Sequence, residues 1–209
     1  MFVPARSIAL GLACLLAAAA LARAGEPEHR MLLLFTMNDL EERGDGTTRP
    51  DVDETAGSPQ VELFGANLVE AGQAGTRFVD WAEREYPAGR AAAWASGVND
   101  EPVNGIALRF QPGDREPLAV RFDVRSTATG APAIRRFQYR IDGEEQFRTV
   151  EENRTLPRDG DFHEVRFDLT ELEELEGAEE LELRWTFAPG EGNGTTRLDN
   201  LKVVAEAGS

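Results

Sequence analysis

Apolar and polar residues alternate along much of the second half of the chain. The alternation is regular over residues 106–110, 118–125, 137–141, 165–169 and 181–187. A period of two is typical of strands with one buried and one solvent-facing side. Turn signals such as Asp142-Gly143 and Pro189-Gly190 separate these segments. Several short strands joined by such turns predict an all-β fold, an antiparallel β-sandwich with little helix.

Three other segments depart from this alternation. Residues 31–37 are an apolar stretch, which predicts a first, buried strand. Residues 41–60 are polar and rich in Gly, Pro and Thr, a composition typical of a long loop. Residues 170–180 are mostly acidic, with Leu172 and Leu175 at helical spacing, and predict one helical turn over an end of the sandwich.

Residues 1–24 have the pattern of a secretory signal peptide. An uncharged apolar stretch covers residues 8–21, and Ala22-Arg23-Ala24 matches an A-x-A cleavage site. The stretch is shorter than the roughly 20 apolar residues that a membrane-spanning helix needs. The sequence around Cys14 does not fit a lipoprotein signal. Cleavage after Ala24 predicts a secreted or periplasmic protein that is not inserted in the membrane.

The residues after the predicted cleavage site suit a single domain. Residues 25–60 hold the first strand and the polar loop, residues 61–209 hold the remainder, and the fold as a whole covers about residues 31–205. The only cysteine lies in the predicted signal peptide, so the exported domain has no disulfide. The exported domain must therefore be stabilised by burial of its core, and a bound metal ion is the one other contribution that we expect.

Composition narrows the classes of function. The 209 residues carry a formal net charge of −16, with 22 Lys and Arg against 38 Asp and Glu. A nucleic acid would meet a surface of its own sign, so a nucleic-acid partner is excluded. The 11 Phe and 3 Trp argue against a disordered acidic protein. The long acidic runs are typical of a solvated surface.

Six short motifs follow one another between residues 94 and 203. They are WASG (94–97), FDVRS with TGAP (122–126 and 129–132), YRIDG (139–143), VRFDL (165–169), LRW (183–185) and TRLDNLKV (196–203). Their order resembles a family of bacterial exported jelly-roll domains, which are similar to carbohydrate-binding modules and galactose-binding-like sandwiches. The resemblance implies a jelly-roll β-sandwich that binds extracellular carbohydrate or a cell-surface polymer without catalysis.

The resemblance also implies a structural Ca²⁺. In similar sandwiches the aspartate that matches Asp199 helps to bind calcium, together with oxygens from the first strand and its following loop. In this chain those ligands would be Asn38, Asp39 and Glu41, all hard oxygen donors of the kind that Ca²⁺ prefers. Asp199 shares its parity with Leu201 and Val203, so a regular strand would bury the carboxylate. The alternative is a bulge in which Asp199 accepts hydrogen bonds from backbone N–H groups.

Three aromatic residues are candidates for the sugar site. Trp81, Tyr86 and Trp94 lie among charged and small residues, and an exposed ring can stack on the apolar face of a pyranose. The alternative for each is burial, because large aromatic side chains are mostly buried. Trp185, which shares its parity with Leu183 and Phe187, is expected in the core.

Six arginines lie on the solvent-facing parity of the predicted strands: Arg109, Arg121, Arg125, Arg140, Arg166 and Arg184. Arginine binds carboxylates and sulfates through paired hydrogen bonds, so Arg121 and Arg125 join the candidates for ligand binding. The alternative is that these arginines form cross-strand pairs with acidic residues and cover the outer face.

Catalysis finds little support in the sequence. His29 and His163 are the only histidines, and no catalytic triad, zinc cluster, phosphate loop or dinucleotide motif is present. The chain is therefore not expected to be an enzyme. Two alternatives to a binding module stay open: a structural or protein-interaction component of the bacterial envelope, and a glycan hydrolase or lyase that uses paired carboxylates.

Overall fold

The computed structural model describes residues 29–38, 47–65, 68–79, 84–86, 88–95, 104–113, 118–175 and 177–206. The predicted signal peptide lies outside the described residues. Within them, the chain consists of strands and one short 3-10 helix, η1 (Glu173–Leu175). No helix in this described part is long and apolar enough to cross a membrane.

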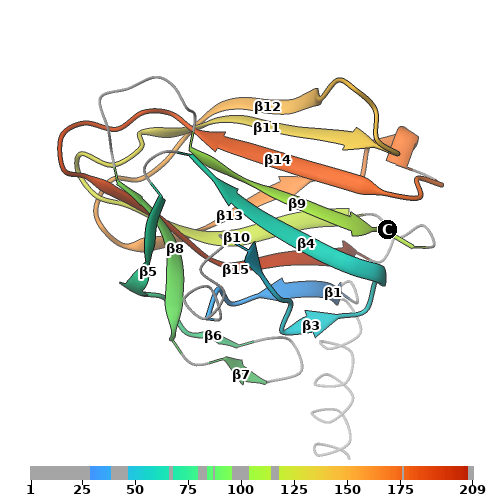
Figure 1. Ribbon diagram of the computed structural model, residues 1–209, viewed down its shortest axis with the longest axis horizontal. Helices are drawn as coiled ribbons and strands as arrows, with labels where there is room; N and C mark the ends of the chain where they lie inside the picture. Colours follow the sequence, from blue (N-terminus) through green and yellow to red (C-terminus); the bar gives the residue numbers. More distant parts are fainter. Residues whose placement is uncertain are drawn as a thin grey trace, which may run out of the picture.

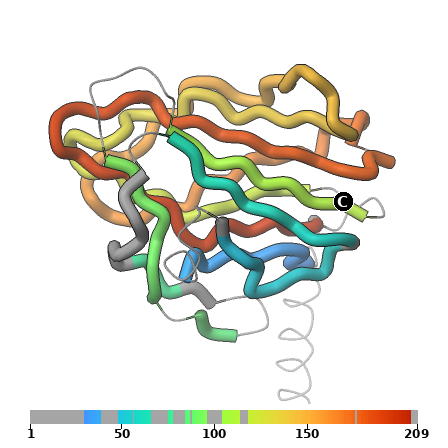
Figure 2. Tube along the Cα trace, in the orientation of Figure 1, coloured from blue at the N-terminus to red at the C-terminus, as the bar shows by residue number. Residues whose placement is uncertain are grey.

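Seven strands form the first sheet. Five follow in the order β13 (Phe162–Asp168), β10 (Leu118–Ser126), β15 (Thr195–Glu206), β1 (His29–Phe35) and β3 (Val52–Asp53). β8 (Arg90–Ala95) pairs with the start of β15, and β5 (Leu68–Ala74) pairs with β8. The first strand, blue in Figure 2, lies beside the last strand, which is red.

Six strands form the second sheet, which lies against the first (Figure 1). Their order is β12 (Arg148–Thr155), β11 (Ala133–Ile141), β14 (Leu181–Phe187), β9 (Gly105–Gln111), β4 (Ala56–Phe64) and β2 (Thr47–Thr48). A separate small ribbon pairs β6 (Phe78–Val79) with β7 (Glu85–Tyr86). All the strand pairs in the two sheets are antiparallel. The predicted antiparallel β-sandwich is confirmed.

Aromatic rings from both sheets meet in the core. The ring of Phe122 on β10 stacks on Trp185 of β14 with their centroids 5.2 Å apart. The ring of Phe167 on β13 stacks on Phe137 of β11 at 4.0 Å. All four side chains are at most 2% exposed. The two sheets are thus joined by apolar contacts between their inner faces, as their alternating sequences require.

The alternating segments and the apolar stretch of residues 31–37 lie where strands were predicted. They fall in β9, β10, β11, β13, β14 and β1. The loop predicted over residues 41–60 is wrong in part, because β2, β3 and the start of β4 lie within it. Backbone hydrogen bonds hold this polar segment to the sheets, for example from Asp51 N to Leu34 O at 2.7 Å. The side chains of this segment do not alternate between apolar and polar, so the sequence does not indicate these strands.

Trp185 offers a test of the core. Its side chain is fully buried, and its indole Nε1 has no hydrogen-bond partner among the described residues. Trp185→Ala should lower the free energy of unfolding by about 3–5 kcal/mol, because it leaves a cavity between the sheets. Trp185→Phe should cost less than half as much, since it keeps a ring and removes the unpaired N–H. Urea unfolding measures both, and equal losses would contradict this account.

Candidate functional site

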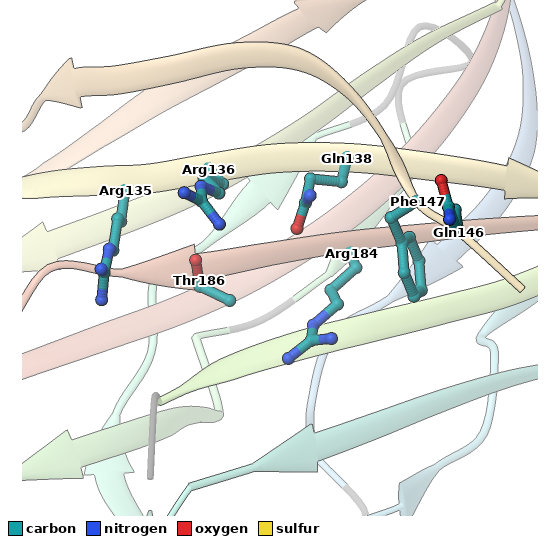
Figure 3. Close-up of a pocket in the computed structure, with 7 residues that line it drawn as sticks. All are labelled: Arg135, Arg136, Gln138, Gln146, Phe147, Arg184 and Thr186. Atoms are coloured by element: carbon teal, nitrogen blue, oxygen red, sulfur yellow. The ribbon is translucent and has the colours of Figure 1, made fainter. Parts of the chain in front are cut away.

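A groove crosses the outer face of the six-stranded sheet. It encloses about 460 Å³ and is lined by Arg135, Arg136, Gln138, Gln146, Phe147, Arg184 and Thr186. The first three come from β11, the last two from β14, and Gln146 and Phe147 from the segment just before β12 (Figure 3). We refer to this feature as the groove.

A β-bulge places two consecutive arginines in the groove. The pairing of β11 with β14 shifts register between Ile134 and Arg136, so Arg135 is an extra residue in β11. Ile134 and Phe137 are buried, whereas both arginines between them are exposed. A regular strand would have turned one of the two inward, so the bulge doubles the positive charge at this edge of the groove.

Two arginines lie over aromatic rings at the groove. The guanidinium carbon of Arg184 lies 4.9 Å from the centroid of the Phe64 ring and 5.5 Å from that of Phe147. The guanidinium carbon of Arg140 lies 4.7 Å from the Phe147 ring. The Phe64 ring crosses Gly105, where a Cβ atom would lie 2.6 Å from its Cζ. These contacts orient Phe147 and Arg184, two of the residues that line the groove.

Carboxylates neutralise the neighbouring arginines of this sheet. Oε2 of Glu182 accepts hydrogen bonds from Nη2 of Arg109 at 3.0 Å and from Nη2 of Arg140 at 2.6 Å. The hydrogen bond to Glu182 raises the pKa of Arg109. In the groove itself, Nε of Arg136 donates to Oε1 of Glu152 at 3.1 Å, and both side chains are half exposed.

The structure separates the three predicted aromatic candidates. Trp94 is 1% exposed, its ring packs 5.1 Å from that of Phe187, and its Nε1 donates to the backbone oxygen of Phe64 at 3.1 Å. Trp94 therefore belongs to the core and offers no free ring face to a sugar. Tyr86 is half-buried in β7. Trp81 lies outside the described residues.

Arg121 and Arg125 lie on the outer face of the other, seven-stranded sheet. Nη1 of Arg121 is 3.7 Å from Oε1 of Glu164. Arg125 on β10 is opposite Arg197 on β15. Both strands belong to the seven-stranded sheet, whereas the groove lies on the six-stranded sheet. Of the six arginines on the solvent-facing parity, four have a carboxylate neighbour within the described ranges: Arg109, Arg121, Arg140 and Arg166. The interpretation of these as ion pairs fits those four, and Arg184 is the one that lies in the groove.

Asp199 is buried on the outer side of the seven-stranded sheet, because β15 contains a bulge. The pairing of β15 with β10 shifts register next to Asp199, and Asn200 has a φ of 48°. Leu198 and Leu201 both point into the core, so Asp199 faces away from it. Its Oδ2 accepts a hydrogen bond from Thr76 N at 2.7 Å and its Oδ1 one from Asn200 N at 2.8 Å.

The surroundings of Asp199 hold a second carboxylate. Nδ2 of Asn200 donates to Oδ2 of Asp123 at 2.7 Å. Burial raises the pKa of Asp199 to about 7, against the lowering effect of the two backbone N–H groups, and Asp123 adds to the rise. An ordinary carboxyl would be fully ionised at neutral pH, so this one is unusually easy to protonate.

The four predicted calcium ligands are only partly placed. Oδ1 of Asn38 accepts a hydrogen bond from Arg90 N at 2.7 Å, next to the segment that contacts Asp199. Asp39 and Glu41 lie outside the described residues. Within the described ranges no group of three or more His, Cys, Asp or Glu residues is arranged to hold a metal ion. Because backbone N–H groups already point at both oxygens of Asp199, the described residues do not make a calcium site by themselves. Calcium binding stays a prediction.

Apart from Arg184, which the solvent-facing parity had singled out, the groove residues were missed at the level of sequence, although two signals exist. Phe147 lies between Gln146 and Arg148, outside every alternating segment. It is therefore an aromatic residue among polar and charged neighbours, which is the criterion that singled out Trp81 and Tyr86. The doublet Arg135-Arg136 interrupts the alternation between Ile134 and Phe137, which is the mark of a bulge.

Comparison with known proteins concerns the fold. No protein-family model matches the chain and no curated protein matches it. Among solved structures, it is similar to the CBM22-1 xylan-binding domain of Xyn10C from Paenibacillus barcinonensis, at 15% identity over 88% of this chain and 99% of that one, with a TM-score of 0.47. It is also similar to TmCBM61, solved with β-1,4-galactotriose, at 10% identity over 85% of this chain and 99% of that one, with a TM-score of 0.39. The xylan-binding module CBM15 is similar at 10% identity over 72% of this chain and 92% of that one, with a TM-score of 0.40. These are similarities only, and the β-sandwich itself is shown by the two antiparallel sheets of this chain.

The buried carboxyl of Asp199 generates a pH prediction. Its pKa of about 7 in the folded protein exceeds the ordinary value of 3.8, so between those values only the folded state holds the proton. The free energy of unfolding contributed by Asp199 therefore falls as pH rises from about 4 to about 7. Asp199→Asn removes the titratable carboxyl, so the Tm of wild type minus the Tm of the variant should decrease across this window. The corresponding decrease in the free energy of unfolding of wild type relative to the variant should be on the order of a few kcal/mol.

Thermal unfolding from pH 4 to 8 in the presence of chelator measures this difference. Asp161→Asn, at an exposed carboxylate, is the matched control and should follow wild type throughout. A difference for Asp199→Asn that is constant or rises with pH would contradict the burial of a protonatable Asp199.

Proposed function

We propose that the chain is an exported, non-catalytic module that binds carbohydrate or a cell-surface polymer along the groove. The observation that carries the proposal is the composition of that groove, in which an aromatic ring lies among side chains that donate hydrogen bonds. Its volume of about 460 Å³ is within the ordinary range for ligand sites.

Each part of the groove suits a sugar. The ring of Phe147 is only half-buried, so one region of it can contact the apolar face of a pyranose. Gln138 and Gln146 each provide an amide, and Thr186 provides a hydroxyl. Sugar hydroxyls both donate and accept hydrogen bonds, so this mixture serves them in several orientations. Because the groove is open on the outer face of a sheet, a polymer can lie along it.

The lining favours binding over glycan hydrolysis. Glycoside hydrolysis ordinarily requires two carboxyl groups on either side of the scissile bond. Among the described residues that line the groove, none is Asp or Glu, and none is His or Tyr. This supports the non-catalytic proposal over the hydrolase and lyase alternatives. The envelope-scaffold alternative predicts that Trp81, Tyr86 and Trp94 are buried and that no groove exists. Trp94 is buried as it predicts, whereas the groove argues against it.

Ring stacking can be tested with one substitution. Phe147→Ala should weaken binding of the best polysaccharide ligand at least tenfold, which corresponds to about 1.4 kcal/mol. The measurement is titration calorimetry or affinity electrophoresis of the purified protein against xylan, galactan, mannan and polygalacturonate. Thermal unfolding should show that the variant is folded, since Phe147 lies outside the core between the sheets.

Tyr86→Ala is the matched control, because Tyr86 is a half-buried aromatic residue of the separate ribbon β6–β7. Loss of binding in Phe147→Ala alone would support the groove. Loss in Tyr86→Ala alone would place the site at the residues first predicted from the sequence. If wild type binds none of the polymers, the proposed function is wrong.

A further inference from the structure

The groove is rich in positive charge, although the protein as a whole is acidic. The chain carries a net charge of −16, yet three of the seven groove residues are arginines. The nearby Arg109 and Arg140 share the carboxylate of Glu182, and Oε1 of Glu180 lies 3.6 Å from Nε of Arg109, so two carboxylates balance these two arginines. The arginines of the groove are not balanced in this way.

Only one of the three groove arginines has a carboxylate partner among the described residues. Arg136 pairs with Glu152. Arg135 is exposed and has no acidic partner in the described part of the chain. Arg184 lies between the rings of Phe64 and Phe147, and its Nε is buried without a hydrogen-bond acceptor among the described residues. That buried Nε is out of a ligand's reach, so the groups of Arg184 that a ligand oxygen could contact are its terminal Nη groups, since the side chain lines the groove.

The arrangement also holds these cations in place. Contact with the two rings holds the Arg184 guanidinium, and its terminal Nη groups remain for a ligand. The bulge in β11 presents Arg135 and Arg136 side by side on the strand next to that of Arg184 (Figure 3). Guanidinium groups form their strongest hydrogen bonds with oxyanions, to which they donate two parallel N–H bonds.

We propose that the groove selects polysaccharides that carry anionic groups, either uronate carboxylates or sulfate esters. The inference rests on the proposed function and names the ligand class of the same site. Phe147 contacts a sugar ring, and Arg135 and Arg184 donate hydrogen bonds to oxyanions on neighbouring sugars. The acidic remainder of the surface repels polyanions, so the preference depends on contact inside the groove and not on long-range attraction.

Matched polymers test the preference. Polygalacturonate and its methyl ester share a backbone and differ in charge, and dextran sulfate and dextran do the same for sulfate. At an ionic strength of about 0.15 M, where the Debye length is about 8 Å, at least one charged polymer should bind tenfold or more tightly than its uncharged partner. The pair that shows the difference identifies the anionic group.

The outcomes separate the two proposals. Equal binding of charged and uncharged partners would overturn the anionic preference and leave carbohydrate binding intact. Binding of poly-L-glutamate as tight as that of polygalacturonate would overturn it too, because that polymer has charge without sugar rings. If no polysaccharide binds, both proposals are wrong.

Variants assign the preference to the groove. Arg135→Gln should weaken binding of the charged polymer about tenfold and leave the uncharged polymer unchanged. Glu152→Gln frees Arg136 and should strengthen binding of the charged polymer severalfold. Arg158→Gln is the control, since Arg158 is another exposed arginine and its substitution changes the net charge equally. If Arg158→Gln matches Arg135→Gln, or Glu152→Gln weakens binding, the groove does not carry the preference.

Discussion

The contact between four aromatic rings determines which side of the strands faces inward. Phe122 and Phe167 from the seven-stranded sheet pack on Trp185 and Phe137 from the six-stranded sheet. A slip of one residue in any of these strands would turn a buried ring to solvent, so the rings also hold the register. The only cysteine of the chain is Cys14, so no disulfide can form within the chain. Burial of apolar side chains therefore stabilises the sandwich without help from disulfides.

Given that constraint, the distinctive features of the outer faces arise where alternation is broken. The extra residue in β11 puts Arg135 beside Arg136 on the outer face. The extra residue in β15 turns Asp199 away from the core and beneath the backbone of Thr76. One bulge exposes a pair of cations, and the other buries an anion. Both depend on the regular strands around them, which the core holds in place.

The limits of prediction follow from the same physics. Alternation along a single strand reports burial on one side, so β9, β10, β11, β13 and β14 could be predicted. β2 and β3 could not, because backbone hydrogen bonds to neighbours distant in sequence hold them. The inward position that a regular strand would give Asp199 is wrong, and the alternative of a bulge with backbone N–H groups on the carboxylate is confirmed. Parity alone could not decide between them, since a positive φ at Asn200 leaves no mark in the apolar pattern. Burial of Trp94 depends on contacts such as that with Phe187, and the groove depends on β11 and β14 being neighbours.

The pairing of β1 with β15 has a consequence for how the chain reaches its folded state. Phe35 is opposite Leu201, and His29 is opposite Glu206. During synthesis the first strand has to wait for almost the entire remaining chain before its principal partner exists. Contacts between residues so distant in sequence carry a large loop-closure cost and form slowly. The seven-stranded sheet can therefore be completed only after the last strand of the chain has been made.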